Sequence, residues 1–161
     1  MFSIKLNQKL KTAIFLPLFL ILLISVTSGC SIKLIADYDE LIDRYATELQ
    51  SKIETFLIKM ERLAGTPEGT YSENTGFYDE LQGTLNTLYL RAQTIDKNEL
   101  VVEQIQLLLE NVANLRKLHQ KQGDSGLTKE LIEPVKTAFN SQFKAIIKLQ
   151  EALKRGKKDE K

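Results

Sequence analysis

Apolar residues recur at every third or fourth position along the chain between about residue 36 and residue 155. This spacing places them on one face of an α-helix, and it predicts four amphipathic helices over residues 36–64, 77–95, 97–122 and 127–155. The segments are rich in Leu, Glu, Gln, Lys and Ala, and none shows the sustained alternation of a half-buried strand. The pattern therefore predicts an all-α fold.

Each predicted helix contributes one apolar stripe to the expected core. The stripes comprise Tyr38, Ile42, Tyr45, Leu49, Ile53, Phe56, Met60 and Leu63; Phe77, Leu81, Leu85, Leu88, Ala92 and Ile95; Val101, Ile105, Leu108, Val112, Leu115 and His119; and Leu131, Val135, Phe139, Phe143, Ile146, Leu149 and Leu153. Short connections force neighbouring helices to run in opposite directions. We therefore expect an antiparallel up-down-up-down four-helix bundle.

Three local features add detail to this bundle. Residues 65–76 form the longest connection, which we expect to pack over one end, either as a plain connector or as a functional loop. Asp96 and Glu99 have the spacing of a capping box at the start of the third helix. Pro134 lacks an amide hydrogen, so it either kinks the last helix or marks its restart.

The first thirty residues follow a different pattern, with a cationic start, an apolar run and small residues. Lys5, Lys9 and Lys11 precede the apolar residues 12–26, and Thr27, Ser28 and Gly29 precede Cys30. This is the layout of a signal peptide. A permanent membrane span is the weaker interpretation, because the apolar run is shorter than the ~20 residues that a spanning helix needs and contains Pro17.

The junction from Val26 to Cys30 resembles the lipobox of bacterial lipoproteins, with Thr27 where that motif usually carries Leu. The resemblance implies cleavage between Gly29 and Cys30 and acylation of the Cys30 thiol. The alternative is an ordinary secretory signal in which Cys30 is incidental. Ser31 follows the cysteine, and in enteric-type lipoproteins such a residue implies export to the outer membrane rather than retention in the inner one.

These features predict four parts of the chain. Residues 1–29 are the signal peptide, 30–35 the lipidated N-terminus and a short tether, 36–155 the bundle, and 156–161 a disordered charged tail. The part that follows the signal is also similar to small helical bacterial envelope proteins of uncharacterised function. That resemblance implies no site residues.

Charge and cysteine content exclude several classes of function. The chain has 22 basic and 21 acidic residues, and three of the basic ones lie in residues 1–29, so the remaining 132 residues carry a formal net charge of −2. A nearly neutral chain has no electrostatic basis for binding nucleic acid. Cys30 is the sole cysteine, so neither a disulfide nor a thiolate metal cluster is expected.

The sequence also lacks recognisable catalytic motifs. His119 is the only histidine, no Gly-x-Ser-x-Gly turn occurs, and Arg116 stands where the Glu-x-x-His pair of a dinuclear metal site would need an acid. We therefore expect no enzymatic activity and no cofactor. A remote hypothesis is haem bound by Met60 and His119, which lie toward the same end of the predicted bundle; buried core residues are the ordinary interpretation.

Together these observations favour a lipid-anchored, non-enzymatic interaction module that faces the periplasm and binds another envelope protein. The alternative is a carrier or sensor of a small ligand, with a pocket between the helices, and an enzyme of unrecognised type is a third hypothesis. A protein partner predicts an exposed apolar patch, whereas a carrier predicts an internal cavity.

Overall fold

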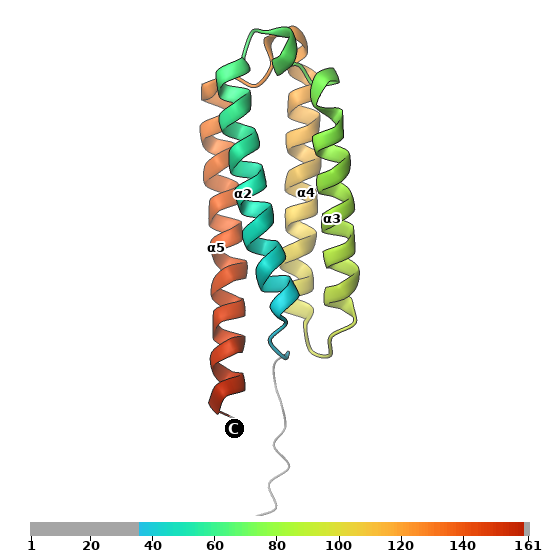
Figure 1. Cartoon of the computed structure of the whole chain (residues 1–161), viewed down its shortest axis with the longest axis vertical. Helices are drawn as coiled ribbons and strands as arrows, with labels where there is room; N and C mark the ends of the chain where they lie inside the picture. Colours follow the sequence, from blue (N-terminus) through green and yellow to red (C-terminus); the bar gives the residue numbers. More distant parts are fainter. Residues whose placement is uncertain (1–35, 160–161) are drawn as a thin grey trace, which may run out of the picture. The chain divides into compact units, whose positions relative to one another are not determined.

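The structure is a computed structural model that describes residues 36–159, and these residues form a bundle of four long helices (Figure 1). The helices are α2 (Glu40–Leu63), α3 (Thr75–Gln93), α4 (Glu99–Gln122) and α5 (Lys129–Asp159). Successive helices run antiparallel, and the described residues include no strand. The all-α fold is thereby confirmed. The predicted signal peptide, the lipobox with Gly29 and Cys30, and the tether lie outside the described residues.

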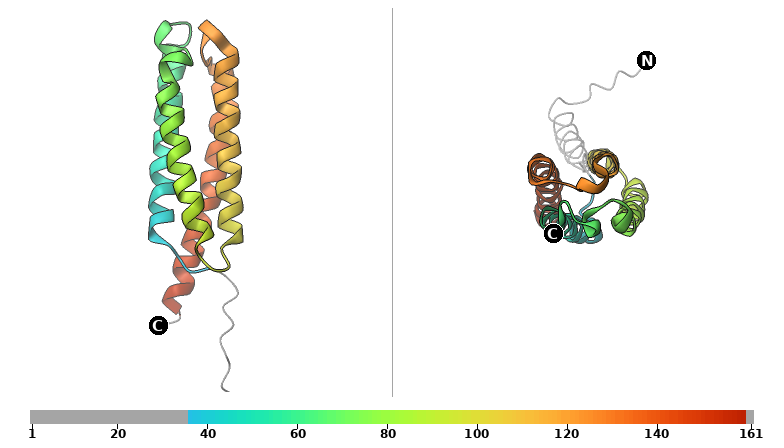
Figure 2. Two further views of the ribbon diagram at one scale, coloured as in Figure 1. Left: turned by 90° about the vertical axis from the view of Figure 1, so that its right-hand side faces the viewer. Right: turned by 90° about the horizontal axis from the view of Figure 1, so that it is seen from above.

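The helices associate as two closely packed pairs. Helix α2 makes its most extensive contacts with α5, and α3 with α4, while α4 and α5 meet along a second seam. Contact between α2 and α3 is sparser, and the two helices are joined by the long connection across one end (Figure 2). The α2–α3 seam is therefore where the surface of the bundle is least closed.

The core follows the predicted stripes closely in the first three helices. All six stripe residues of α4 are buried, and so are most of those in α2 and α3. In α5 the buried face is shifted, with Leu131, Val135 and Leu149 at its margin and Ile132 and Gln150 inside. Each fully buried Leu, Ile or Phe contributes roughly 1.5–3 kcal/mol, so the stripes are the main source of stability.

Helix α2 begins four residues later than predicted because Asp39 caps it. The Asp39 Oδ1 atom accepts hydrogen bonds from the amides of Leu41 at 2.9 Å and Ile42 at 3.0 Å, and Arg91 of α3 forms an ion pair with the same carboxylate. Burial raises the pKa of Asp39, but Arg91 and the two amides lower it further, so the carboxyl pKa lies below its usual value. This contact ties the start of α2 to the end of α3.

The capping box predicted at the start of α4 is wrong. Helix α4 begins at Glu99, two residues after Lys97, whose φ of 60° places it in the left-handed region and outside any helix. Asn98 occupies the cap position without a side-chain cap bond, and its Nδ2 donates instead to the Ala92 carbonyl at 2.9 Å. The Asn98 side chain thus closes the α3–α4 turn.

Helix α5 continues through Pro134 without a restart and runs to Asp159. The tail predicted to be disordered from residue 156 is therefore helical over its first four residues. Basic residues crowd this end of the sequence, and positive charge near a helix C-terminus interacts favourably with the unpaired carbonyls. The loss of apolar residues after Leu153 marks the end of the buried face of α5 and not the end of the helix itself.

Candidate functional site

The connection between α2 and α3 is a compact loop that closes one end of the bundle. It contains two short 3-10 helices, Pro67–Gly69 and Ser72–Asn74, and both Gly69 and Asn74 are buried. The Asn74 Nδ2 donates to the carbonyls of Glu68 and Thr70, each at 2.8 Å. The prediction that this loop packs over the end of the bundle is confirmed.

The α4–α5 connection interlocks with this loop. The Gly65 amide donates to the Ser125 carbonyl at 2.9 Å. Gly126 has a φ of 62°, and a Cβ at this position would lie 2.6 Å from the Gly69 carbonyl oxygen. A side chain is therefore excluded at Gly126 both by its backbone conformation and by the neighbouring chain.

His119 fastens the loop to the helices. Its ring is fully buried, with Nε2 2.9 Å from the Gly69 carbonyl and Nδ1 2.8 Å from the Tyr78 hydroxyl. A carbonyl only accepts, so Nε2 carries the proton and, in the neutral ring, Nδ1 accepts from Tyr78. His119 thus joins α4, α3 and the end loop through one side chain.

This geometry does not fit the haem hypothesis for Met60 and His119. Both residues are buried toward the same end of the bundle, as predicted, but both ring nitrogens of His119 already bond protein groups. An iron ligand needs a free nitrogen lone pair. Met60 fills the core.

Aromatic rings surround His119 and extend the cluster to the surface. Tyr71, Tyr78 and Phe56 all make edge contacts with the imidazole, at centroid distances of 5.8–6.2 Å. The Arg116 Nε donates to the Tyr71 hydroxyl at 2.8 Å, and its Nη1 lies 3.1 Å from the Asp79 Oδ1. The cluster is therefore a rigid junction in which every polar group named has a partner.

We predict that the stability of the bundle falls as the pH drops below about 6.5, because His119 must then be protonated. Burial lowers the pKa of the imidazole, and the bond to the Gly69 carbonyl raises it by less. The unfolded chain therefore takes up a proton at higher pH than the folded chain. The neutral, buried His119 therefore contributes its full share to the free energy of unfolding above the pKa of an exposed histidine. That share is lost as the pH falls through the lower pKa of His119 in the folded state.

Urea denaturation between about pH 4.5 and 7.5 measures this dependence, since most carboxyl groups protonate below that range. The His119→Gln variant has no imidazole to titrate, and its unfolding free energy should be nearly constant over the same range. An equal pH dependence in both proteins would contradict the assignment to His119.

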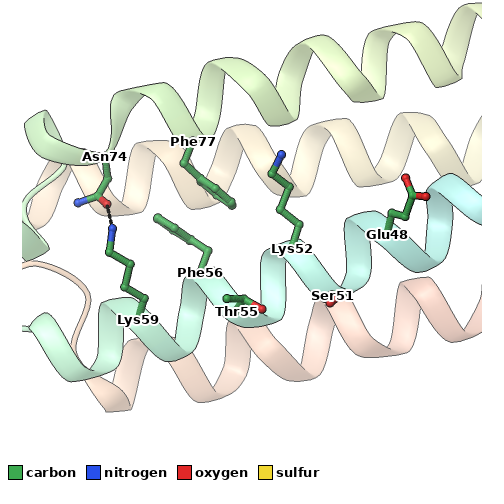
Figure 3. A pocket seen from close by; sticks show the side chains of 8 residues that line it. All are labelled: Glu48, Ser51, Lys52, Thr55, Phe56, Lys59, Asn74 and Phe77. Atoms are coloured by element: carbon green, nitrogen blue, oxygen red, sulfur yellow. Dashed lines mark hydrogen bonds between the residues drawn. The ribbon is translucent and has the colours of Figure 1, made fainter.

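A groove of about 520 Å³ opens on the α2–α3 seam beside this junction (Figure 3). Its lining residues come from three turns of α2, from the end loop and from the start of α3: Glu48, Ser51, Lys52, Thr55, Phe56, Lys59, Asn74 and Phe77. Phe56 and Phe77 form its apolar centre, with stacked rings whose centroids are 3.6 Å apart and whose planes differ by 5°. The groove is open to solvent along one side.

The charges in the groove are unevenly compensated. Lys52 forms an ion pair with Glu80 of α3, and Glu48 lies 3.7 Å from Arg44. Lys59 donates to the Asn74 Oδ1 at 3.4 Å, and among residues 36–156, whose side chains the structure describes, no carboxylate lies within ion-pair distance of it. The end of the groove next to the loop therefore carries an uncompensated positive charge.

Sequence reasoning did not identify this groove. The spacing of Phe56 and Phe77 places both residues on core stripes, and nothing in it indicates that α2 and α3 make only sparse contact. Tyr78, next to the stripe residue Phe77, is itself fully buried, with its hydroxyl against His119. A signal was available in the single polar residue of the α4 stripe, because a buried imidazole requires partners.

Comparison with known proteins adds no further constraint. Neither the protein-family models, nor the curated proteins, nor the solved structures include a match to this chain. Within the described residues, no group of three or more His, Cys, Asp or Glu side chains is placed to hold a metal ion. No helix among them has both the length and the apolar character to cross a membrane.

Proposed function

We propose that this protein is a lipid-anchored, non-enzymatic interaction module at the periplasmic face of a bacterial membrane, the outer one, and that it binds another envelope protein through the α2–α3 groove. The observation that carries the proposal is the groove itself. An apolar centre flanked by charged side chains is typical of a surface that recognises a protein segment.

The anchor rests on the sequence before the bundle. The layout of Lys5, Lys9, Lys11, the apolar run and Cys30 supports processing as a lipoprotein. Ala36 lies six positions after Cys30, and an extended chain of that length reaches about 20 Å. The start of α2 lies at the end of the bundle opposite the end loop (Figure 1). The bundle would stay near the bilayer, with its groove opening sideways.

The absence of catalysis is supported by the state of His119. A general base or nucleophile partner must reach a substrate, but this ring is fully buried and both of its nitrogens are engaged. The polar groups of the groove itself are one carboxylate, two lysines, two hydroxyls and one amide, and their hydrogen bonds include no nucleophile–base pair.

The anchor is tested by the intact mass of the protein extracted from membranes of its native cells. We expect a chain that starts at Cys30 and carries acyl groups, whereas the Cys30→Ala variant should keep residues 1–29 and lack lipid. A wild-type chain that is unmodified or starts elsewhere would contradict the lipoprotein assignment.

The groove is tested in the same cells by placing a photo-crosslinking amino acid at Ser51, which is exposed and lines the groove. Asn140, exposed on α5, is the matched control position. We expect a covalent adduct with one envelope protein at Ser51 and none at Asn140. Equal adducts at both positions, or none at Ser51, would contradict partner binding at this groove.

The second candidate function is a small-ligand carrier or sensor. The observation in its favour is the groove volume of about 520 Å³, which falls in the range of roughly 300–1,000 Å³ found for small-molecule sites. Such sites bury most of their ligand, and a groove open along one side does so less well than it accepts a protein. A small molecule that co-purifies in stoichiometric amount would favour the carrier.

A further inference from the structure

We infer that the segment bound in the α2–α3 groove is an amphipathic helix that lies along α2 and places an acidic side chain against Lys59. The inference rests on the proposed function and specifies the chemistry of its partner. It follows from the backbone of the groove walls, from the length of the groove and from its charges.

The groove walls favour a helix over an extended peptide. The lining residues between Glu48 and Lys59 lie inside α2, so their main-chain groups are bonded within that helix, and α3 contributes Phe77 from its first turn. An extended peptide against this surface would bury amides and carbonyls without partners. A helix satisfies its own backbone and presents only side chains.

The dimensions of the groove set the length of the bound helix. Glu48 and Lys59 are eleven residues apart on α2, which corresponds to about 16 Å, or three turns. The stacked rings of Phe56 and Phe77 lie between these two ends and offer an apolar surface to the middle of the partner helix (Figure 3). Apolar side chains spaced three and four apart on the partner would meet this surface.

The charges set the direction of the bound helix. Lys59 is the lysine of the groove that has no carboxylate as an ion-pair partner among the described side chains, whereas Lys52 is already paired with Glu80. An acidic side chain at one end of the partner helix would pair with Lys59. Glu48, with 60% of its side chain exposed, favours a neutral or basic residue about three turns away at the other end.

The test starts from the partner peptide crosslinked at Ser51, identified by mass spectrometry and then synthesised. We measure its affinity for the full protein, for Lys59→Glu and for Lys117→Glu, a charge reversal of the same kind on the exposed face of α4. We expect at least a tenfold loss of affinity for Lys59→Glu and less than a twofold change for Lys117→Glu. Both lysines are exposed, so neither change should affect folding.

A second peptide, with its acidic residue changed to Lys, completes the cycle. We expect this peptide to bind the wild-type protein at least tenfold more weakly than the original, and to recover most of that loss on Lys59→Glu. Circular dichroism should show helix in the peptide when it is bound.

Four results would overturn the inference. A crosslinked peptide that stays extended, or one that binds wild type and Lys59→Glu equally, would exclude the charged helix while the adduct at Ser51 still supported a protein partner. A small amphiphile bound in the groove in place of a protein would also exclude it. The absence of any adduct at Ser51 would remove the inference together with the proposed function.

Discussion

Replacement of His119 by alanine will lower the free energy of unfolding by about 3–5 kcal/mol. The substitution removes both hydrogen bonds of the ring and leaves the Gly69 carbonyl and the Tyr78 hydroxyl without these partners. Each buried group left unpaired costs about 1–3 kcal/mol, and the space vacated by the imidazole adds a cavity term. Since small domains are stable by only about 5–15 kcal/mol, this single change removes a large share of the total.

Guanidinium denaturation followed by far-UV circular dichroism measures this effect. Gln120→Ala, one residue along α4 and exposed, is the matched control and should change stability by less than about 0.5 kcal/mol. His119→Gln keeps one polar group at the site and should fall between the two. A His119→Ala protein within about 1 kcal/mol of the wild type would mean that the end loop is not held by this residue.

The sequence predicts the helices of the bundle well because burial imposes a period on each of them. In α4 every predicted stripe residue is inside, from Val101 to His119. The spacing of apolar residues predicts which residues are buried, since a helix that packs on one side needs apolar residues on that side alone. The same reasoning failed in α5, where the buried Gln150 replaces Leu149 on the inner face. Residue polarity predicts the buried face of a helix less well where apolar residues occupy adjacent positions.

Helix ends and the groove could not be predicted in the same way because they depend on contacts between distant parts of the chain. Asp39 caps α2 while paired with Arg91, which lies 52 positions away. The groove exists because α2 packs against α5 more closely than against α3, and no local pattern records that difference. Pairwise helix packing, rather than helix formation, decides where this surface opens.

The end loop and the groove share residues, which links the stability of one to the shape of the other. Asn74 organises the loop through two carbonyls and also accepts from Lys59 at the end of the groove. Phe56 contacts both the His119 ring and Phe77. Loss of the loop structure would therefore free the Lys59 side chain from Asn74 and change the end of the groove next to the loop. We expect binding at the groove to require an intact junction.

Gly69→Ala will destabilise the protein by about 3 kcal/mol, because the end loop leaves no room for a side chain at this position. A Cβ there would lie 2.1 Å from the Leu63 carbonyl oxygen and 2.8 Å from its carbonyl carbon, and both are main-chain atoms at the end of α2. The loop must shift to relieve this overlap. That shift moves the Gly69 carbonyl away from His119 Nε2, so the hydrogen bond weakens as well.

Gly76→Ala is the matched control for Gly69→Ala, because no heavy atom lies within 4 Å of a Cβ at that position and its φ is not in the left-handed region. It lies in the first turn of α3, where alanine in place of glycine should stabilise the protein by up to about 1 kcal/mol. Chemical denaturation gives both values, and amide hydrogen exchange over residues 65–76 shows whether the loop opens. We expect faster exchange there in Gly69→Ala alone. Equal stability of the two variants would refute the tight packing of the loop against α2, since that contact distinguishes the two glycines.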